Sequence, residues 1–111
     1  MIIQVENNKE KEMISRTILE ALPDWFGIPE AREEYIVNSV NQQLFAAVKE
    51  EKTIGFLCLK QTGKDTVEVS VMGVLKEFHR HGIGRKLFMK AREKAIKDGF
   101  SFIQVKTVQM G

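Results

Sequence analysis

The sequence predicts an α/β domain over residues 1–111, built on a mixed and mostly antiparallel sheet with helices flanking it. The first observation is the order of the elements, which reads strand, two helices, three strands, helix, strand, with no repeat or linker. The second is the last strand–helix–strand unit, whose length suits a crossover between two parallel strands. The runs at 44–48 and 53–59 read instead as an antiparallel hairpin.

The N-terminal third supplies a strand and two helices. Residues 1–5 form a short run of mostly apolar side chains, and the asparagines that follow suit a helix cap. Residues 9–22 place apolar side chains mostly three and four positions apart, which is typical of an amphipathic helix. A proline ends this helix, and another proline opens the second one, expected over 29–40.

The middle of the chain is rich in β-prone residues. The runs 44–48 and 53–59 are separated by four charged residues. Residues 66–75 alternate and then become fully apolar, as expected for a central strand. Gly73 lies inside this strand, and a strand glycine predicts either a bulge or the close approach of another group.

The C-terminal part predicts a helix and a strand. Residues 84–97 are strongly periodic, and the Asp98–Gly99 pair ends that helix. Residues 100–108 read as a further strand, after which the chain ends.

Composition excludes several classes of protein. With 29% charged residues and a net charge of +2, the chain lacks the dense basic stripe that binds nucleic acid, so no nucleic-acid partner is expected. The N-terminus shows neither a signal peptide nor a membrane span, so a cytoplasmic protein without membrane contact is expected. The single cysteine, Cys58, sits in an apolar run and reads as a buried hydrophobe.

The turn Gly82-Ile83-Gly84 joins the apolar strand to the last helix. Glycines at a helix start allow a tight turn and a close ligand, and the first helical N–H groups have no partner inside the helix. Such a site binds phosphate, and Arg80 and Arg85 add positive charge. A turn that uses glycine for geometry alone is the alternative. The dinucleotide fingerprint does not fit, because Leu87 stands where its third glycine belongs.

Val69 to Phe88 resembles the acetyl-CoA motif of the GNAT superfamily of N-acetyltransferases, whose core is Arg/Gln-x-x-Gly-x-Gly/Ala after an apolar strand. His79 departs from the motif at the Arg/Gln position. The preceding segments also look like the family's first strand, paired helices and hairpin. Because family members continue with another helix and two strands, the resemblance implies a GNAT-like acyltransferase fold without that C-terminal part. The chain is then a fragment, a protein completed otherwise, or one that no longer catalyses.

The resemblance implies that acetyl-CoA is bound as the acetyl donor. The backbone of Met72 and Val74 would hold the pantetheine arm, and the N–H of Met72 would stabilise the developing oxyanion. The turn would bind the pyrophosphate. The residues implied to bind the cofactor are Met72, Gly73, Val74, His79, Arg80, His81, Gly82, Ile83, Gly84 and Arg85.

An amine substrate must lose a proton before it attacks the thioester, so a base is useful. Glu68 is the first candidate, because it matches a glutamate of some family members. Its even spacing from Met72 places both side chains on one face of the strand if no bulge intervenes. A solvated strand carboxylate is the alternative reading. Glu77, in the loop, is a weaker candidate.

The remaining candidates each have a structural alternative. His79 and His81 lack a third ligand, so no metal is expected. Trp25, Phe26 and Ile28 would line an acceptor pocket or close the core, and Tyr35 has the same ambiguity.

Three functions remain open. The first is acetyl transfer to a primary amine, on a small molecule or a peptide, by direct attack on the thioester. The second is a non-catalytic acyl-CoA-binding or interaction module, and the third is a structural partner without ligand. An open last strand predicts a homodimer.

Overall fold

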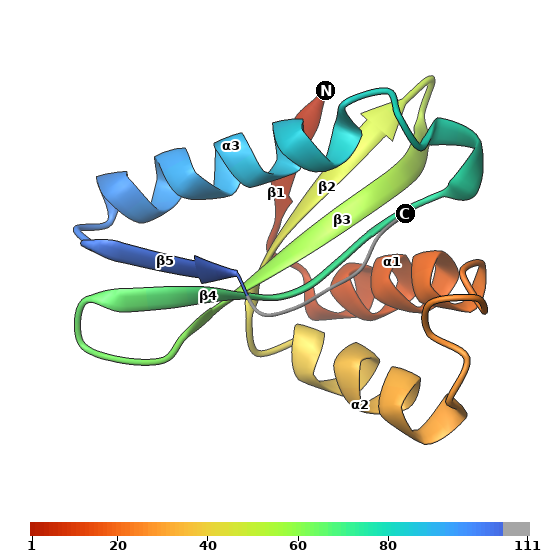
Figure 1. Ribbon diagram of the computed structural model, residues 1–111, viewed down its shortest axis with the longest axis horizontal. Helices are drawn as coiled ribbons and strands as arrows, with labels where there is room; N and C mark the ends of the chain where they lie inside the picture. Colours follow the sequence, from red (N-terminus) through yellow and green to blue (C-terminus); the bar gives the residue numbers. More distant parts are fainter. Residues whose placement is uncertain (106–111) are drawn as a thin grey trace.

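A computed structural model describes residues 1–105 and contains one five-stranded sheet with three α-helices (Figure 1). The strands lie in chain order, and only the last pair, β4 and β5, is parallel. The predicted α/β class and mixed, mostly antiparallel sheet are therefore confirmed. The elements are β1 (Ile2–Val5), α1 (Asn8–Glu20), α2 (Pro29–Ser39), β2 (Gln43–Lys49), β3 (Lys52–Gln61), β4 (Thr66–Val74), a 3-10 turn (Lys76–Phe78), α3 (Ile83–Lys97) and β5 (Phe102–Val105).

The boundaries follow the expected signals. The side chain of Asn7 caps α1 by accepting a hydrogen bond from the N–H of Glu10 at 3.1 Å, and Pro29 opens α2. The strand expected over 100–108 is present over 102–105, while 106–108 lie outside the described residues. No helix in residues 1–105 has both the length and the apolar character needed to cross a lipid bilayer.

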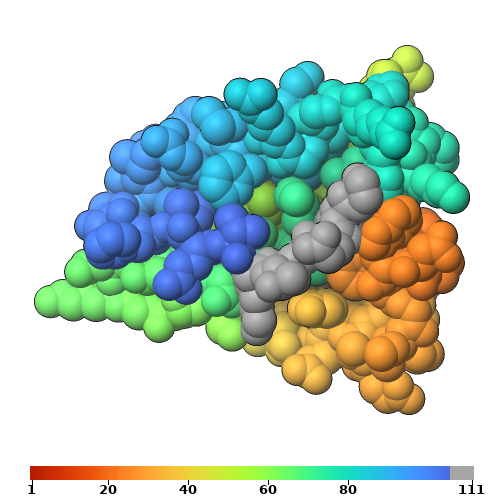
Figure 2. Space-filling model, viewed as in Figure 1, coloured from red at the N-terminus to blue at the C-terminus, as the bar shows by residue number. Residues whose placement is uncertain are grey.

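The sheet is the middle layer of three (Figure 1). Helix α3 covers one face, and α1 and α2 cover the other, so that the core forms on both sides of β3 and β4. In the space-filling view, α3 (blue to cyan) and the segment around α2 (orange to yellow) lie on opposite sides of the sheet atoms (Figure 2). The largest side chains with less than 2% exposure include Phe45, Phe56, Ile18, Leu19 and Leu87.

Two contacts fix α2 against α1. The hydroxyls of Ser15 and Ser39 hydrogen-bond in the buried seam at 3.1 Å. At the surface, the Arg16 guanidinium binds Glu33 at 2.7 Å, and these hydrogen bonds raise the pKa of Arg16 and lower that of Glu33. The position of α2 matters because it forms one wall of a cavity described below.

Strand β4 contains a bulge, but not at Gly73. Cys58 of β3 pairs with Val71 and Leu59 pairs with Val69, which leaves Ser70 without a partner on β3. Gly73 is in regular register, and a Cβ there would lie 3.0 Å from Ile18 Cγ2. Of the two alternatives predicted for Gly73, the bulge is therefore wrong, and the close approach of another group, here Ile18 of α1, explains the glycine.

The bulge also changes the faces of β4. Met72 lies against the start of α3, where its Cε atom is 3.5 Å from the place of a Cβ on Gly84. Glu68 instead lines a cavity with residues of α2, on the other side of the sheet. Glu68 and Met72 were expected on one face of the strand if no bulge intervened. Ser70 is such a bulge, so the two side chains lie on opposite faces of the sheet.

Candidate functional site

The turn before α3 exposes a run of backbone donors. Arg80 and Gly82 both have left-handed backbone angles, with φ of 68° and 74°. The first helical bond of α3 runs from the N–H of Lys86 to the carbonyl of Gly82 at 3.0 Å. The six N–H groups of residues 80–85 donate no hydrogen bond within residues 1–105. Six free donors at a helix N-terminus are suited to bind an anion.

A left-handed Arg80 was not predicted from the sequence. Such an angle is strained for a residue with a Cβ atom, and the sequence signal for a tight turn was the pair of glycines, Gly82 and Gly84. Left-handed residues also occur in anion-binding nests, where successive backbone N–H groups line a concavity.

A cavity of about 250 Å³ opens between the end of β4 and the start of α3. We call it the β4–α3 cavity. Seven of the ten predicted cofactor-binding residues line it, together with Phe78, which was not predicted. The seven are Met72, Val74, His79, Arg80, Gly82, Ile83 and Gly84. The other three, Gly73, His81 and Arg85, do not line it.

The charge beside this cavity is positive. Arg80 lines it, and the first turn of α3 contains no acidic residue. Arg85 and Lys86 are exposed on that first turn. These side chains add to the partial positive charge of the helix terminus.

Among the described residues, 1–105, one edge of β4 has no partner strand beside the cavity. The N–H of Leu75 donates to the carbonyl of Ile54 at 2.8 Å, which marks a hydrogen-bonded pair of β3 and β4. Because such pairs alternate along an antiparallel ladder, the backbone groups of Val74 and Met72 point away from β3. The β4–β5 ladder ends at the pair Val69 and Val105. Within residues 1–105, Met72 and Val74 therefore face an unpaired edge.

His79 takes up part of this edge. Its Nε2 atom lies 2.7 Å from the carbonyl oxygen of Val74, so the tautomer with hydrogen on Nε2 donates to that oxygen. The ring of Trp25 packs edge-on against His79, with 5.2 Å between ring centroids. The side chain of His79 thus holds the turn against β4, and the N–H of Val74 and both backbone groups of Met72 remain at the edge.

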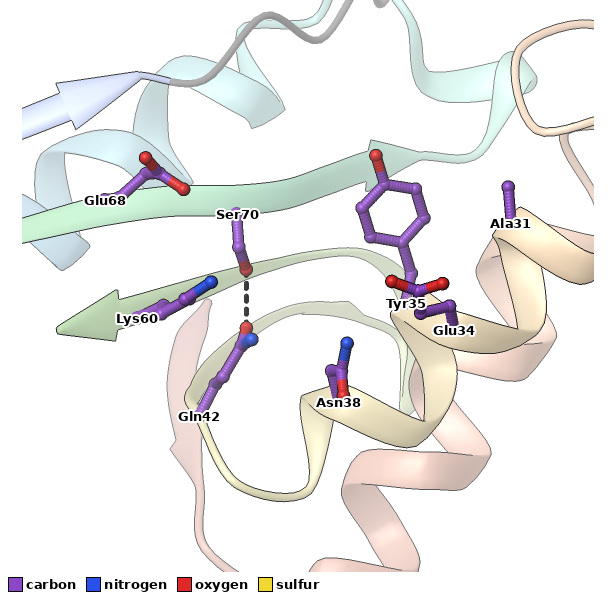
Figure 3. A pocket seen from close by; sticks show the side chains of 8 residues that line it. All are labelled: Ala31, Glu34, Tyr35, Asn38, Gln42, Lys60, Glu68 and Ser70. Atoms are coloured by element: carbon purple, nitrogen blue, oxygen red, sulfur yellow. Dashed lines mark hydrogen bonds between the residues drawn. The ribbon is translucent and has the colours of Figure 1, made fainter. Parts of the chain in front are cut away.

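A second cavity, of about 210 Å³, lies on the other face of the sheet between α2 and β4 (Figure 3). We call it the α2–β4 cavity. Glu68 points into it from β4, and Tyr35 and Glu34 enter from α2. Ser70, the bulge residue, donates a hydrogen bond to Gln42 Oε1 across its floor. Within residues 1–105, its lining residues are Ala31, Glu34, Tyr35, Asn38, Gln42, Lys60, Glu68 and Ser70.

Most of these residues were missed from the sequence. Lys60 lies directly opposite Glu68 in the β3–β4 register, a pair that the predicted hairpin of 44–48 and 53–59 does not include. Gln42 lies just after α2 and accepts a hydrogen bond from the bulged Ser70. Glu77, the weaker candidate base, lies in the 3-10 turn and lines neither cavity.

Each of the four large side chains proposed for an acceptor pocket had a place in the core as its alternative. Phe26 is 9% exposed and belongs to the core, where it packs edge-on against Tyr35. Tyr35 is half-buried against the core and also lines the α2–β4 cavity. Trp25 packs on the core and on His79, whereas Ile28 is 66% exposed and does neither.

Within residues 1–105, the structure supports neither a reactive cysteine nor a metal site. Cys58 is fully buried, and burial raises its pKa to about 12, so it is a thiol at neutral pH. In residues 1–105, no three His, Cys, Asp or Glu side chains are grouped so as to hold a metal ion.

Comparison with known proteins supplies the family. A sequence model described as "Acetyltransferase (GNAT) family" matches residues 12–110 of the chain. None of the curated proteins with which the chain was compared matches it.

Solved acetyltransferases share the fold at low sequence identity. An IAA acetyltransferase from Bacillus cereus is 24% identical, with a TM-score of 0.76 over 96% of this chain and 65% of that one. An aminoglycoside acetyltransferase from an uncultured soil sample, in complex with sisomicin, is 20% identical, with a TM-score of 0.71 over 98% and 78%. A PaiA N-acetyltransferase from Thermoplasma acidophilum, in complex with coenzyme A, is 19% identical, with a TM-score of 0.68 over 90% and 75%. The chain thus spans less than two thirds of the length of the Bacillus enzyme.

Proposed function

Because this chain belongs to the acetyltransferase (GNAT) family, we propose that it transfers an acetyl group from acetyl-CoA to a primary amine. The amine attacks the thioester directly, without a covalent enzyme intermediate. The observation that carries the proposal is the run of six backbone N–H groups at residues 80–85, which donate no hydrogen bond within the described part of the chain and lie at the positive end of α3.

The residues around the β4–α3 cavity fit acetyl-CoA. The N–H groups of 80–85 would bind the pyrophosphate, with Arg80 and Arg85 adding charge. The open edge at Met72 and Val74 would pair with the amides of the pantetheine arm as an added strand does. A structural neighbour that contains coenzyme A supports this assignment at the level of the fold.

Two groups of the chain would act on the reaction. When bound, acetyl-CoA supplies a thioester carbonyl that an amine can attack. The N–H of Met72 points to the unpaired edge and would donate a hydrogen bond to that carbonyl oxygen as negative charge develops. Glu68 would accept the proton of the ammonium, directly or through a water molecule.

The two faces of β4 make this division of roles possible. A backbone N–H at a strand edge lies near the plane of the sheet, so it is reached from both faces. The cofactor would approach from the α3 face and the amine from the α2 face, where Glu68 lies.

Calorimetric titration with acetyl-CoA, followed by release of CoA thiol in the presence of an amine panel, tests the proposal. We expect saturable binding and amine-dependent thiol release. Binding without transfer to any amine would favour the alternative, a non-catalytic acyl-CoA-binding module. Absence of both heat and a shift in melting temperature would reject both functions.

A further inference from the structure

We infer that Gln42 is a positioning residue of the reaction, because its side chain holds the bulged Ser70 of β4 in place (Figure 3). Glu68 lies two residues before the bulge and Met72 two residues after it, so their relative position depends on Ser70. This inference rests on the proposed function, in which the Glu68 carboxylate and the Met72 N–H act on the same reaction.

The side chain of Ser70 has one short contact. Ser70 has no register partner on β3 and is 9% exposed. Its Oγ atom lies 2.5 Å from Gln42 Oε1 and 3.5 Å from the carbonyl oxygen of Cys58. A hydroxyl has one hydrogen to donate, and only the first distance lies within the usual range, so the hydrogen is directed to Gln42. The bulge is therefore tied to the segment between α2 and β2.

Gln42 is itself anchored to both helices on this face of the sheet. Its N–H donates to the carbonyl of Ser39 at 3.1 Å, and its own carbonyl accepts from the ammonium of Lys11 on α1 at 2.7 Å. The Ser39 hydroxyl in turn pairs with Ser15 in the buried seam between the helices. The side chain of Gln42 thus reaches Ser70 from a fixed backbone.

The core and the Gln42 contact have different effects on the bulge. Val69 and Val71 flank Ser70, are 2% and 1% exposed, and pair with successive residues of β3, so they are buried on opposite faces. Burial of two valines outweighs the net gain from one neutral hydrogen bond. Loss of the Gln42 contact would therefore keep the bulge but release the exact position of Ser70.

A small release matters at this place. A displacement of about 1 Å in a reacting group can lower the rate by up to about a hundredfold. The turn at residues 80–85 contributes none of the contacts of Gln42 described above. We therefore expect a loss in kcat without a loss in affinity for acetyl-CoA.

The test compares two substitutions of Gln42 that keep its length. Gln42→Met removes the acceptor oxygen and should lower kcat roughly tenfold at saturating amine, with the dissociation constant for acetyl-CoA unchanged. Gln42→Glu keeps an oxygen that accepts from Ser70 and should restore most of kcat. Gln43→Met is the matched control, because Gln43 is the next residue, hydrogen-bonds with Asp98 and does not line the α2–β4 cavity.

A double-mutant cycle tests whether the effect passes through Ser70. Ser70→Ala removes the donor of the same hydrogen bond. If the two side chains act through one contact, the variant with both Gln42→Met and Ser70→Ala should lose no more kcat than either single variant. Losses that multiply in the double variant would overturn the inference.

Backbone amide NMR shifts of the free chain give a readout that needs neither cofactor nor catalysis. The shifts of Glu68 and Met72 should change in Gln42→Met, return toward wild type in Gln42→Glu and stay unchanged in Gln43→Met. Unchanged shifts in Gln42→Met would overturn the inference. If the wild type transfers acetyl groups and Gln42→Met keeps its full kcat, the inference fails and the proposed function stands. If the shifts respond as expected but the wild type transfers no acetyl group, the proposed function fails, while the placement of Glu68 by Gln42 stands.

Discussion

His79 links the cofactor turn to β4 through a single contact, the 2.7 Å hydrogen bond from its ring to the carbonyl of Val74. The residue therefore acts through backbone geometry, although the family motif has Arg or Gln at this place. The His79 ring also packs edge-on against Trp25 and lines the β4–α3 cavity.

We expect His79→Ala to raise the dissociation constant for acetyl-CoA several-fold, since the net value of such a hydrogen bond is about 1 kcal/mol. His79→Gln, which keeps an N–H donor, should recover part of the affinity. His81→Ala is the control, because His81 contacts Phe78 and does not line the cavity. Fluorescence of Trp25, the only tryptophan, reports the same titration. Equal losses in the two alanine variants would contradict a specific role for the Val74 contact.

The two candidate bases differ in position, because Glu68 lines the α2–β4 cavity and Glu77 lines neither cavity. We expect Glu68→Gln to lower kcat by roughly a hundredfold or more, because it removes the general base. Binding of acetyl-CoA should not change, since Glu68 lies on the α2 face. Glu77→Gln should leave both quantities unchanged, and a larger effect at Glu77 would reverse the assignment. Steady-state kinetics with one amine acceptor measures both variants.

Strand β4 is the element on which the site depends. Its bulge at Ser70 places Glu68 on one face and Met72 on the other, and the Gln42 side chain holds that bulge. The register also points the Met72 N–H away from β3. A β4 without the bulge would put both side chains on the α3 face.

Two glycines of this region should respond differently to alanine. A Cβ at Gly73 would lie 3.0 Å from Ile18 Cγ2, so Gly73→Ala should lower the free energy of unfolding by about 1–3 kcal/mol through overpacking. A Cβ at Gly84 would meet the Met72 sulfur at 3.6 Å, an ordinary contact, so Gly84→Ala should cost little. Urea denaturation of both variants measures the difference. A stable Gly73→Ala would show that α1 does not pack on β4 as described.

The elements themselves were predictable because their signals are local. Helical periodicity, the Asn7 cap and the glycines at Gly82 and Gly84 each act within a few residues of the chain. The bulge was not predictable, because it depends on how Ser70 meets β3 and Gln42 in space. The strained φ of Arg80 likewise had no signal, since arginine has no preference for that region.

At the scale of the whole molecule, the β4–α3 cavity and the α2–β4 cavity lie on opposite faces of the central sheet, with the edge of β4 between them. The first is proposed to bind the cofactor and the second the amine. The sequence predicted the turn because it is contiguous, whereas the α2–β4 cavity combines residues from four segments of the chain. The homodimer stays a prediction.

We propose that the N–H groups of residues 80–85 bind the pyrophosphate of the cofactor. The most direct measurement is the change in backbone amide NMR shifts of the isotope-labelled chain on titration with coenzyme A and, separately, with pantetheine. We expect coenzyme A to cause the largest changes in amide chemical shift at residues 80–85, with smaller changes at Met72 and Val74. Pantetheine, which lacks the pyrophosphate, should change the shifts of Met72 and Val74 only. Saturable binding of coenzyme A without a change in the amide shifts of 80–85 would reject this assignment of the pyrophosphate site.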